Sequence, residues 1–236
     1  MGTLHLLLIA TSLCVLPVGS RAETTQQSSI LLESFDTNPV ATFPSHWQAR
    51  QDKEIARQIY RVAEENGNRF LHAYANSRGI EVGLVKVFRA QETPVLRWRW
   101  RVLQLPPGAD ERTAATNDSA AGVWVIFDNR VLPRALKYVW STTQPVGSRI
   151  TNPGYWRART IVLRSGTAQV GAWQAETVNV YEDYKALFGE EPGEVQGIAV
   201  KTSSDSTKSI AVADYDDFIL QAIEGQASSQ AADSLH

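Results

Sequence analysis

The stretch Val95–Val102 reads Val-Leu-Arg-Trp-Arg-Trp-Arg-Val, and its alternation decides the fold. A period of two is that of a β-strand, whose successive side chains point to opposite faces of a sheet. Burying a Trp ring stabilises a fold by roughly 4–6 kcal/mol at most, whereas burying an unpaired guanidinium costs several kcal/mol. We therefore expect the apolar side of the strand in the core and the basic side outside. The apolar side holds Leu96, Trp98, Trp100 and Val102, and the basic side holds Arg97, Arg99 and Arg101.

Composition places the chain among ordinary globular proteins. Its 236 residues are 43% hydrophobic and 20% charged, which suffices for one domain with a sizeable core. The net charge of −2 offers no basic excess, so we expect no nucleic-acid partner. Seven Trp residues against one Met favour β architecture over helical packing.

The amino-terminal segment is typical of an export signal. The apolar run Leu4–Val18 is too short to span a bilayer and is followed by the small residues Ser20 and Ala22. We predict a signal peptide over residues 1–22 and a periplasmic or secreted protein that does not span the membrane after processing. Cys14 leaves with the signal, so the mature chain has no cysteine. Residues 23–29 are expected to form a polar leader, 30–220 a single domain, and 221–236 a disordered tail.

Short strand-like runs separated by turn residues fill the domain. Asn66-Gly67 marks a hairpin between two of them, and Pro106–Ala121 is expected to be a long loop. One short helix is predicted at Glu182–Phe188, ended by Gly189. The pattern indicates an all-β fold, an antiparallel β-sandwich of jelly-roll type whose first and last strands lie near each other. The expected strands are Ile30–Phe35, Tyr60–Ala63, Phe70–Ala75, Ile80–Phe88, Val95–Val102, Val123–Phe127, Leu136–Trp140, Arg157–Leu163, Val178–Val180, Val195–Val200 and Ile210–Leu220.

Several of these motifs together resemble a bacterial family of exported domains of unknown function. The resemblance covers most of Leu32–Leu220 and implies an exported β-sandwich without an established activity. In such relatives the loop after Val200 carries two acidic residues, whereas Ser203–Thr207 keeps only Asp205. More loosely, the first and last strands are similar to those of sugar-binding jelly-roll modules. The motifs that carry the family resemblance are Leu96–Val102, Tyr138-Val139-Trp140, Asn152-Pro153, Trp173 with Glu176, Asp183-Tyr184, Phe188-Gly189-Glu190, Gly197–Val200 and Ala213–Asp217.

The basic side of the central strand is the first candidate site. Three guanidiniums on one strand face form a line of positive charge, which calls for carboxylates on neighbouring strands or for an anionic ligand. Two interpretations stay open: a sheet face knitted by ion pairs with Glu176 and nearby Asp residues, and a groove for an acidic glycan. The residues expected to bind a ligand are Arg97, Arg99, Arg101, Tyr138, Glu176 and Asp205.

Aromatic platforms and metal ligands are weaker candidates. Trp47 and Trp156 lie in turn-rich stretches and are the Trp residues most expected to be exposed. No resident cofactor is expected, although Asp214–Asp217 with Glu33 or Asp36 offers oxygen ligands for a structural calcium ion.

Catalytic signatures are largely missing from the sequence. It contains no nucleophile elbow, phosphate-binding loop or dinucleotide fingerprint. Two enzyme mechanisms nevertheless stay open. A glycoside hydrolase would pair Glu176 with Asp205 or Asp217, and a polysaccharide lyase would pair Arg99 with Tyr138 or His72. The sequence therefore favours an exported, non-catalytic binder of a glycan or another anionic envelope component, with an enzyme acting on acidic polysaccharide as the alternative.

Overall fold

Strand β6 (Val95–Gln104) has the two faces that its sequence predicts. In the computed structural model, which describes residues 28–49, 51–128 and 132–222, Trp98 and Trp100 are at most 1% exposed. Their rings meet edge to face, with centroids 5.4 Å apart. Arg97, on the opposite face, is exposed to solvent. The face assignment made from the alternation is confirmed.

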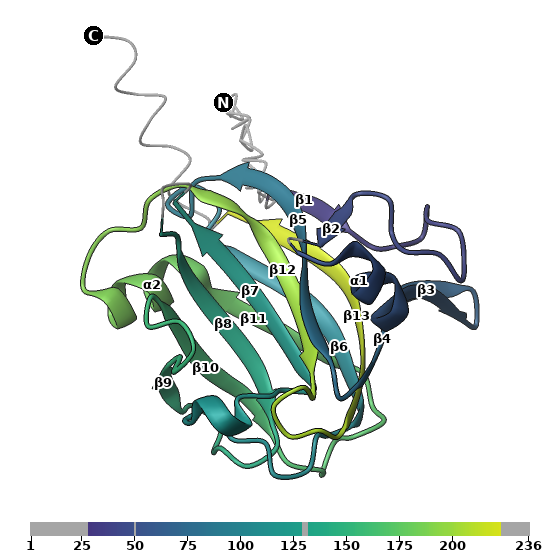
Figure 1. Cartoon of the computed structure of the whole chain (residues 1–236). Coiled ribbons are helices and arrows are strands. Elements are labelled where there is room, and N and C mark those ends of the chain that lie inside the picture. Colours follow the sequence, from purple (N-terminus) through teal and green to yellow (C-terminus); the bar gives the residue numbers. More distant parts are fainter. Residues whose placement is uncertain (1–27, 50, 129–131, 223–236) are drawn as a thin grey trace, which may run out of the picture.

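Two sheets pack face to face around this strand (Figure 1). The first sheet, sheet A, runs in the order β11-β6-β13-β4-β3, with β1 also paired to β13. The second, sheet B, runs β2-β5-β12-β7-β8-β10-β9. The strands of sheet A are β11 (Gln174–Asn179), β6, β13 (Ile210–Gln221), β4 (Asn68–Asn76), β3 (Tyr60–Glu65) and β1 (Ser29–Glu33). Those of sheet B are β2 (Trp47–Ala49), β5 (Gly79–Phe88), β12 (Val195–Ser203), β7 (Ala121–Phe127), β8 (Arg134–Ser141), β10 (Ala158–Ser165) and β9 (Arg149–Thr151).

Aromatic rings from both sheets form the centre of the core. Trp98 of sheet A packs on Tyr138 of sheet B with ring centroids 5.7 Å apart, and Trp100 packs on Trp140 at 6.2 Å. All four side chains are almost fully buried. Each ring contributes on the order of 150–250 Å² of buried area, so these contacts hold the two sheets together.

The topology confirms a jelly-roll-like β-sandwich. The first and last strands are antiparallel neighbours, with Ser29 opposite Gln221. The Asn66-Gly67 hairpin joins β3 to β4, and both turn residues have positive φ, at 53° and 81°. One pair departs from the antiparallel prediction: β10 runs parallel to β8. The connection through residues 142–157 is long enough to bring the chain back in the same direction.

The helix prediction needs two corrections. The predicted helix is α2 (Val180–Phe188), which begins earlier than expected because the Asn179 side chain accepts a hydrogen bond from the Glu182 N–H and caps it. β11 therefore ends at Asn179, and Val180 is helical rather than extended. A second helix, α1 (Lys53–Ile59), was not predicted. A single 3₁₀ turn, η1 (Ala114–Thr116), lies within the predicted long loop.

The predicted signal peptide and most of the predicted tail lie outside the described residues. No helix in the described ranges is long and apolar enough to cross a membrane.

Candidate functional site

The arginines of β6 are paired with carboxylates from neighbouring strands. Arg99 forms ion pairs with Asp216 and Asp217, each at 2.7 Å. Arg101 pairs with Asp214 at 2.8 Å and with Glu65 at 2.9 Å. The side chains of Asp214 and Asp216 are only 1% exposed, so these two carboxylates are shielded from water, whereas Asp217 and Glu65 are partly exposed. The ion-pair interpretation of the stripe therefore describes Arg99 and Arg101.

Trp173 covers these pairs from outside. Its ring lies 5.3 Å from the guanidinium carbon of Arg99 and 4.8 Å from that of Arg101. The ring of Phe70 meets the Trp173 ring edge to face, with their centroids 5.4 Å apart. A stacked, paired guanidinium has little capacity left for a ligand. Within the described part of the chain, only Arg97 of the three has no ion-pair partner, and it is exposed.

Tyr138 and Glu176 lie on the other side of sheet A from the stripe. The hydroxyl of Tyr138, buried between the sheets, donates to Asp183 at 2.9 Å. Burial, together with the negative charge of Asp183, raises the pKa of this phenol well above its usual value. Glu176 is opposite Trp98 in the ladder and so shares its inward face, where it accepts from Trp100 Nε1 at 2.8 Å and pairs with Arg164 at 2.5 Å.

The six predicted ligand-binding residues therefore do not form one site. Glu176 is not a partner of the stripe, because strand parity turns it toward the core. The lyase pairing of Arg99 with Tyr138 is wrong, because Arg99 lies on the outer face of sheet A while Tyr138, on sheet B, packs against the inner face. Asp217 pairs with Arg99 on the outer face, so it does not face Glu176.

Asp205 and Glu33, suggested as a ligand-binding residue and a calcium ligand, contact other parts of the protein instead. Asp205, in the β12–β13 loop, lies beside Gly79, where a Cβ would come within 2.4 Å of its Oδ1. Glu33 accepts from the Phe35 N–H and from Trp47 Nε1. No group of three or more acidic, His or Cys side chains suited to a metal ion occurs in the described ranges.

Of the two Trp residues predicted to be exposed, one is exposed and one is buried. Trp156 is 65% exposed, as predicted. Trp47 is only 3% exposed, which corrects the prediction: its ring packs against Phe35 and Phe218 with centroids within 6 Å of it. β2 pairs with β5 and so turns this ring into the core.

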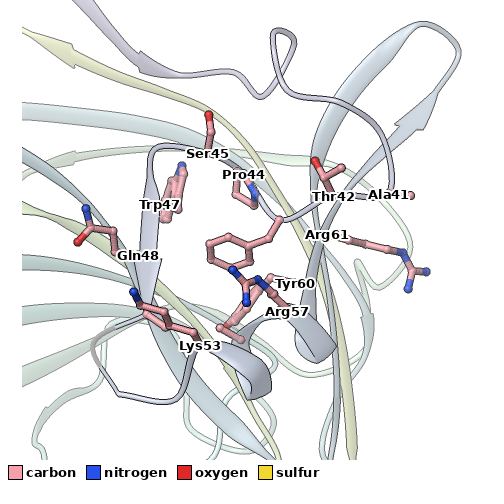
Figure 2. A pocket seen from close by; sticks show the side chains of 13 residues that line it. Ala41, Thr42, Pro44, Ser45, Trp47, Gln48, Lys53, Arg57, Tyr60 and Arg61 are labelled. Carbon is pink, nitrogen blue, oxygen red and sulfur yellow. The ribbon is translucent and has the colours of Figure 1, made fainter.

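A cleft lies beside α1 and is called here the α1 cleft (Figure 2). Its volume is about 790 Å³, within the range of small-ligand sites. Trp47 and Tyr60 form a nearly buried floor, and Phe43 is half-buried beside them. The lining residues are Ala41, Thr42, Phe43, Pro44, Ser45, Trp47, Gln48, Ala49, Lys53, Ala56, Arg57, Tyr60 and Arg61.

Positive charge without a lining carboxylate distinguishes the α1 cleft from the stripe. Lys53, Arg57 and Arg61 line it and are exposed, while none of the described lining residues is Asp, Glu or His. Arg57 pairs with Glu54 at 2.6 Å on the exposed helix surface. In the described ranges, no ion pair involves Lys53 or Arg61. Figure 2 shows these two side chains at opposite ends of the opening.

Local sequence explains how α1 places Lys53 and Arg57, while Arg61 follows on β3. The Asp52 side chain accepts from the Glu54 and Ile55 N–H groups at 2.9 and 3.0 Å and starts the helix. Ala56 and Ile59 are buried and anchor its inner side. The hydroxyl of Tyr60, which follows at the start of β3, donates to the Ile80 carbonyl at 2.8 Å and accepts from the Thr202 N–H at 2.9 Å.

This cleft is not among the sites predicted from the sequence. Two signals for it were present: an N-capping Asp52 and cations at every fourth position, Lys53, Arg57 and Arg61.

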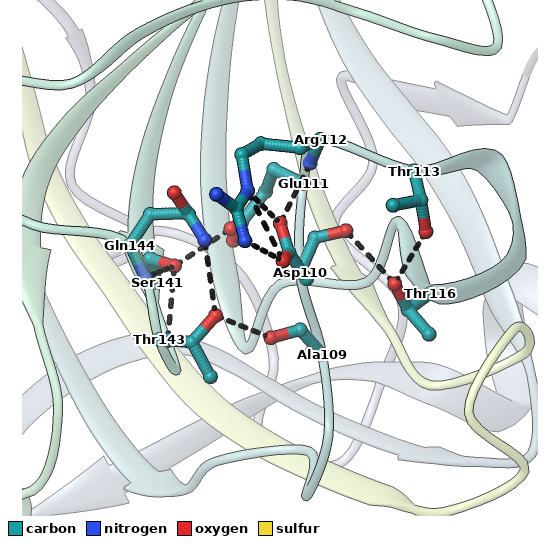
Figure 3. Close-up of polar contacts among 9 residues, drawn as sticks. All are labelled: Ala109, Asp110, Glu111, Arg112, Thr113, Thr116, Ser141, Thr143 and Gln144. Carbon is teal, nitrogen blue, oxygen red and sulfur yellow. Dashed lines mark hydrogen bonds and ion pairs between the residues drawn. The ribbon is translucent and has the colours of Figure 1, made fainter.

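A buried polar network ties the predicted long loop to the outer face of sheet B (Figure 3). Glu111 is fully buried and accepts hydrogen bonds from Ser119 at 3.0 Å and from Ser141 at 2.6 Å. Lys137, only 3% exposed, donates to Ser119 at 3.3 Å, and its ammonium lies 5.5 Å from the Trp124 ring. Burial, with the nearby charge of Lys201, lowers the pKa of Lys137 to about 8. The network fixes the loop and supports the Trp124 ring.

Sequence comparison assigns the chain to a family. The family model described as "Protein of unknown function (DUF3047)" matches residues 45–219, which include β2 to β12 and most of β13. The chain belongs to the DUF3047 family. This agrees with the resemblance to a family of unknown function. No curated protein matches the sequence of this DUF3047 chain.

Solved structures with a similar arrangement of strands include carbohydrate-binding and carbohydrate-degrading proteins. TmCBM61, solved with β-1,4-galactotriose, is 11% identical, with 80% of this chain and 94% of that chain covered and a TM-score of 0.38. The carbohydrate recognition domain of Emp47p is 12% identical, with 86% and 99% covered and a TM-score of 0.43. The family 11 xylanase of Neocallimastix patriciarum is 13% identical, with 82% and 100% covered and a TM-score of 0.36. At these values the likeness of the DUF3047 chain to these structures carries no conclusion about what the chain does.

Proposed function

We propose that this protein is a non-catalytic binding module for an acidic glycan and that the α1 cleft holds the ligand. The observation that carries the proposal is the charge of the cleft: Lys53, Arg57 and Arg61 line it, and no carboxylate does among the residues that the structure describes. Because the chain as a whole has a net charge of −2, this local excess of positive charge is a property of the cleft. Such a cleft attracts anions and orients them by charge-assisted hydrogen bonds.

The remaining lining suits a sugar. A pyranose ring has an apolar face of C–H groups and an edge of hydroxyls, so its site needs apolar surface beside hydrogen-bonding groups. Phe43 and Pro44 supply apolar surface in the cleft, and Thr42, Ser45 and Gln48 supply donors and acceptors. An acidic sugar uses both kinds of group and the cations as well.

Binding without turnover follows from the groups that line the cleft. Glycoside hydrolysis needs two carboxyl groups across the scissile bond, and a lyase needs a base near the proton it removes. The described lining residues include no carboxylate and no imidazole. The one phenol, Tyr60, is buried, and its pKa is raised mainly by that burial. As the sequence indicates, the proposed setting is the periplasm or the cell exterior.

Titration calorimetry with polygalacturonate and with its methyl ester tests the proposal. The two polymers share a backbone and differ in charge. We expect binding of the free acid only, weakening as salt shortens the screening length from about 10 Å toward about 3 Å.

The triple variant Lys53→Ala, Arg57→Ala, Arg61→Ala should lose at least tenfold in affinity. A matched control, Lys86→Ala, Arg89→Ala, Arg112→Ala, removes the same charge from exposed positions outside the cleft and should bind normally. Equal binding of the acid and the ester, equal losses in the two triple variants, or release of shortened sugar products would each contradict the proposal.

A further inference from the structure

A second, smaller pocket lies on the outer face of sheet B. Its volume is about 220 Å³. It is lined by Gln51, Gly79, Ile80, Glu81, Trp124 and Lys201. The pocket therefore combines one aromatic ring with several polar side chains, which is the composition expected of a sugar-binding surface.

The ring of Trp124 is placed by its strand and by the network beneath it. Val123 and Val125, its neighbours on β7, are fully buried in the core, so strand alternation turns Trp124 outward. The buried ammonium of Lys137 lies 5.5 Å from the ring centroid. Trp124 Nε1 has no hydrogen-bond partner within the described structure. A rigid ring of this kind loses little entropy when a sugar packs on it.

Charge in this pocket is balanced, unlike that in the α1 cleft. Glu81 and Lys201 are directly opposite each other in the β5–β12 ladder. Gln51 adds an exposed amide. The pocket therefore offers hydrogen bonds and a stacking surface without a net attraction for anions, and suits the uncharged part of a glycan.

One short segment lines both openings. Gln48, Ala49 and Lys53 line the α1 cleft, and Gln51 lines the pocket. The register places Gln48 opposite Gly83, Gly83 opposite Ala199, and Ala199 opposite Trp124. Gln48 and Trp124 are therefore three strand spacings apart, or about 14 Å at ~4.8 Å per spacing. The two openings are neighbours along the β2–α1 segment, at a separation that an extended chain spans and a single sugar does not.

From this juxtaposition we infer that the α1 cleft and the Trp124 pocket are two subsites for one linear acidic oligosaccharide. An acidic sugar occupies the cleft, and a sugar ring further along the same chain stacks on Trp124. The inference rests on the proposed function, because it takes the cleft as the site for the acidic group. It adds that the ligand is a chain and that affinity depends on its length.

Calorimetry with digalacturonate and hexagalacturonate tests the inference. The wild-type protein should bind the hexamer at least tenfold more tightly than the dimer, because only the hexamer reaches both subsites. Trp124→Ala should remove this advantage and leave the affinity for the dimer unchanged. Gln51→Ala, at an exposed position that does not endanger folding, should reduce the advantage about threefold. Trp156→Ala, which removes an exposed ring outside both openings, is the matched control and should leave both affinities unchanged.

The outcomes distinguish failure of the second subsite from failure of the α1 cleft. If the wild-type protein binds both oligomers equally, or if Trp124→Ala and Gln51→Ala both leave the hexamer's advantage intact, the second subsite is refuted while the cleft stands. If Trp124→Ala weakens both oligomers equally while Gln51→Ala changes nothing, Trp124 acts on the fold and the inference is again refuted. If neither oligomer binds, the proposed function fails together with the inference that rests on it.

Discussion

Replacing the buried Lys137 with Met should remove a specific pH dependence of stability. The pKa of Lys137 is lowered from 10.5 to about 8, chiefly because burial disfavours its charged form. The folded state therefore holds this proton less tightly than the unfolded state does. The contribution of Lys137 to stability is fully present above its pKa in the unfolded state. It is lost as pH falls through its folded-state pKa of about 8.

The size of the effect follows from the two pKa values. At 1.36 kcal/mol per pKa unit, the full contribution is about 3 kcal/mol. About 2 kcal/mol of it falls between pH 7 and pH 9.5, below the range in which tyrosines ionise. Wild-type stability relative to Lys137→Met should therefore rise by about 2 kcal/mol across that interval.

Urea unfolding at a series of pH values measures this difference. Lys86→Met, at an exposed position on β5, is the matched control and should keep the wild-type slope. Absolute stability is not the readout, because the Met variant also removes the ammonium that donates to Ser119 and the positive charge that acts on the buried Glu111. Parallel pH profiles for wild type and Lys137→Met would refute the reasoning, since the ammonium would then feel the same environment folded and unfolded.

Two further predictions concern sheet A. Trp100→Ala should cost about 3–5 kcal/mol of unfolding free energy, the range for a large ring removed from a packed core, whereas Arg97→Ala, at an exposed position, should cost less than about 0.5 kcal/mol. Chemical denaturation of the two variants checks the face assignment of β6, and the reverse ranking would overturn it. Asp216 has its pKa raised to about 6, mainly by burial; its contribution to stability is therefore present below the unfolded pKa near 4 and is lost as pH rises through about 6. Asp216→Asn should remove a pH dependence of the unfolding free energy on the order of 1–3 kcal/mol between pH 4 and pH 6. The measurement is the difference in unfolding free energy between wild type and variant at each pH. A difference that stays constant across this interval would contradict the raised pKa of Asp216.

The sequence was sufficient for whatever depends on local periodicity. The alternation in Val95–Val102 predicts both faces of β6, and Asn66-Gly67 predicts the hairpin between β3 and β4. Both features depend only on residues that are neighbours in the sequence. The spacing of Tyr184, Leu187 and Phe188, with Gly189 at φ 73°, likewise predicts the helix that became α2.

The side-chain pairs formed between neighbouring strands could not be predicted from local periodicity. Which carboxylate meets Arg99 depends on the register of β13, and the face of Glu176 depends on that of β11. The α1 cleft needs β2, α1 and the start of β3 to come together, and α1 has only seven residues, too few for a periodic signal. Trp47 lies in a turn-rich stretch and still reaches the core, because β2 adds to the edge of sheet B.

The antiparallel pairing of β1 with β13 has a mechanical consequence. Ser29 lies opposite Gln221, so the backbone enters and leaves the sandwich at the same end of one ladder. A force that pulls these two points apart would open the ladder one hydrogen bond at a time, because the load falls on the outermost pair alone. Force along the strands would instead load many bonds together. Held by one end, the domain feels no force between Ser29 and Gln221, so a single tether does not pull this ladder open from its two ends.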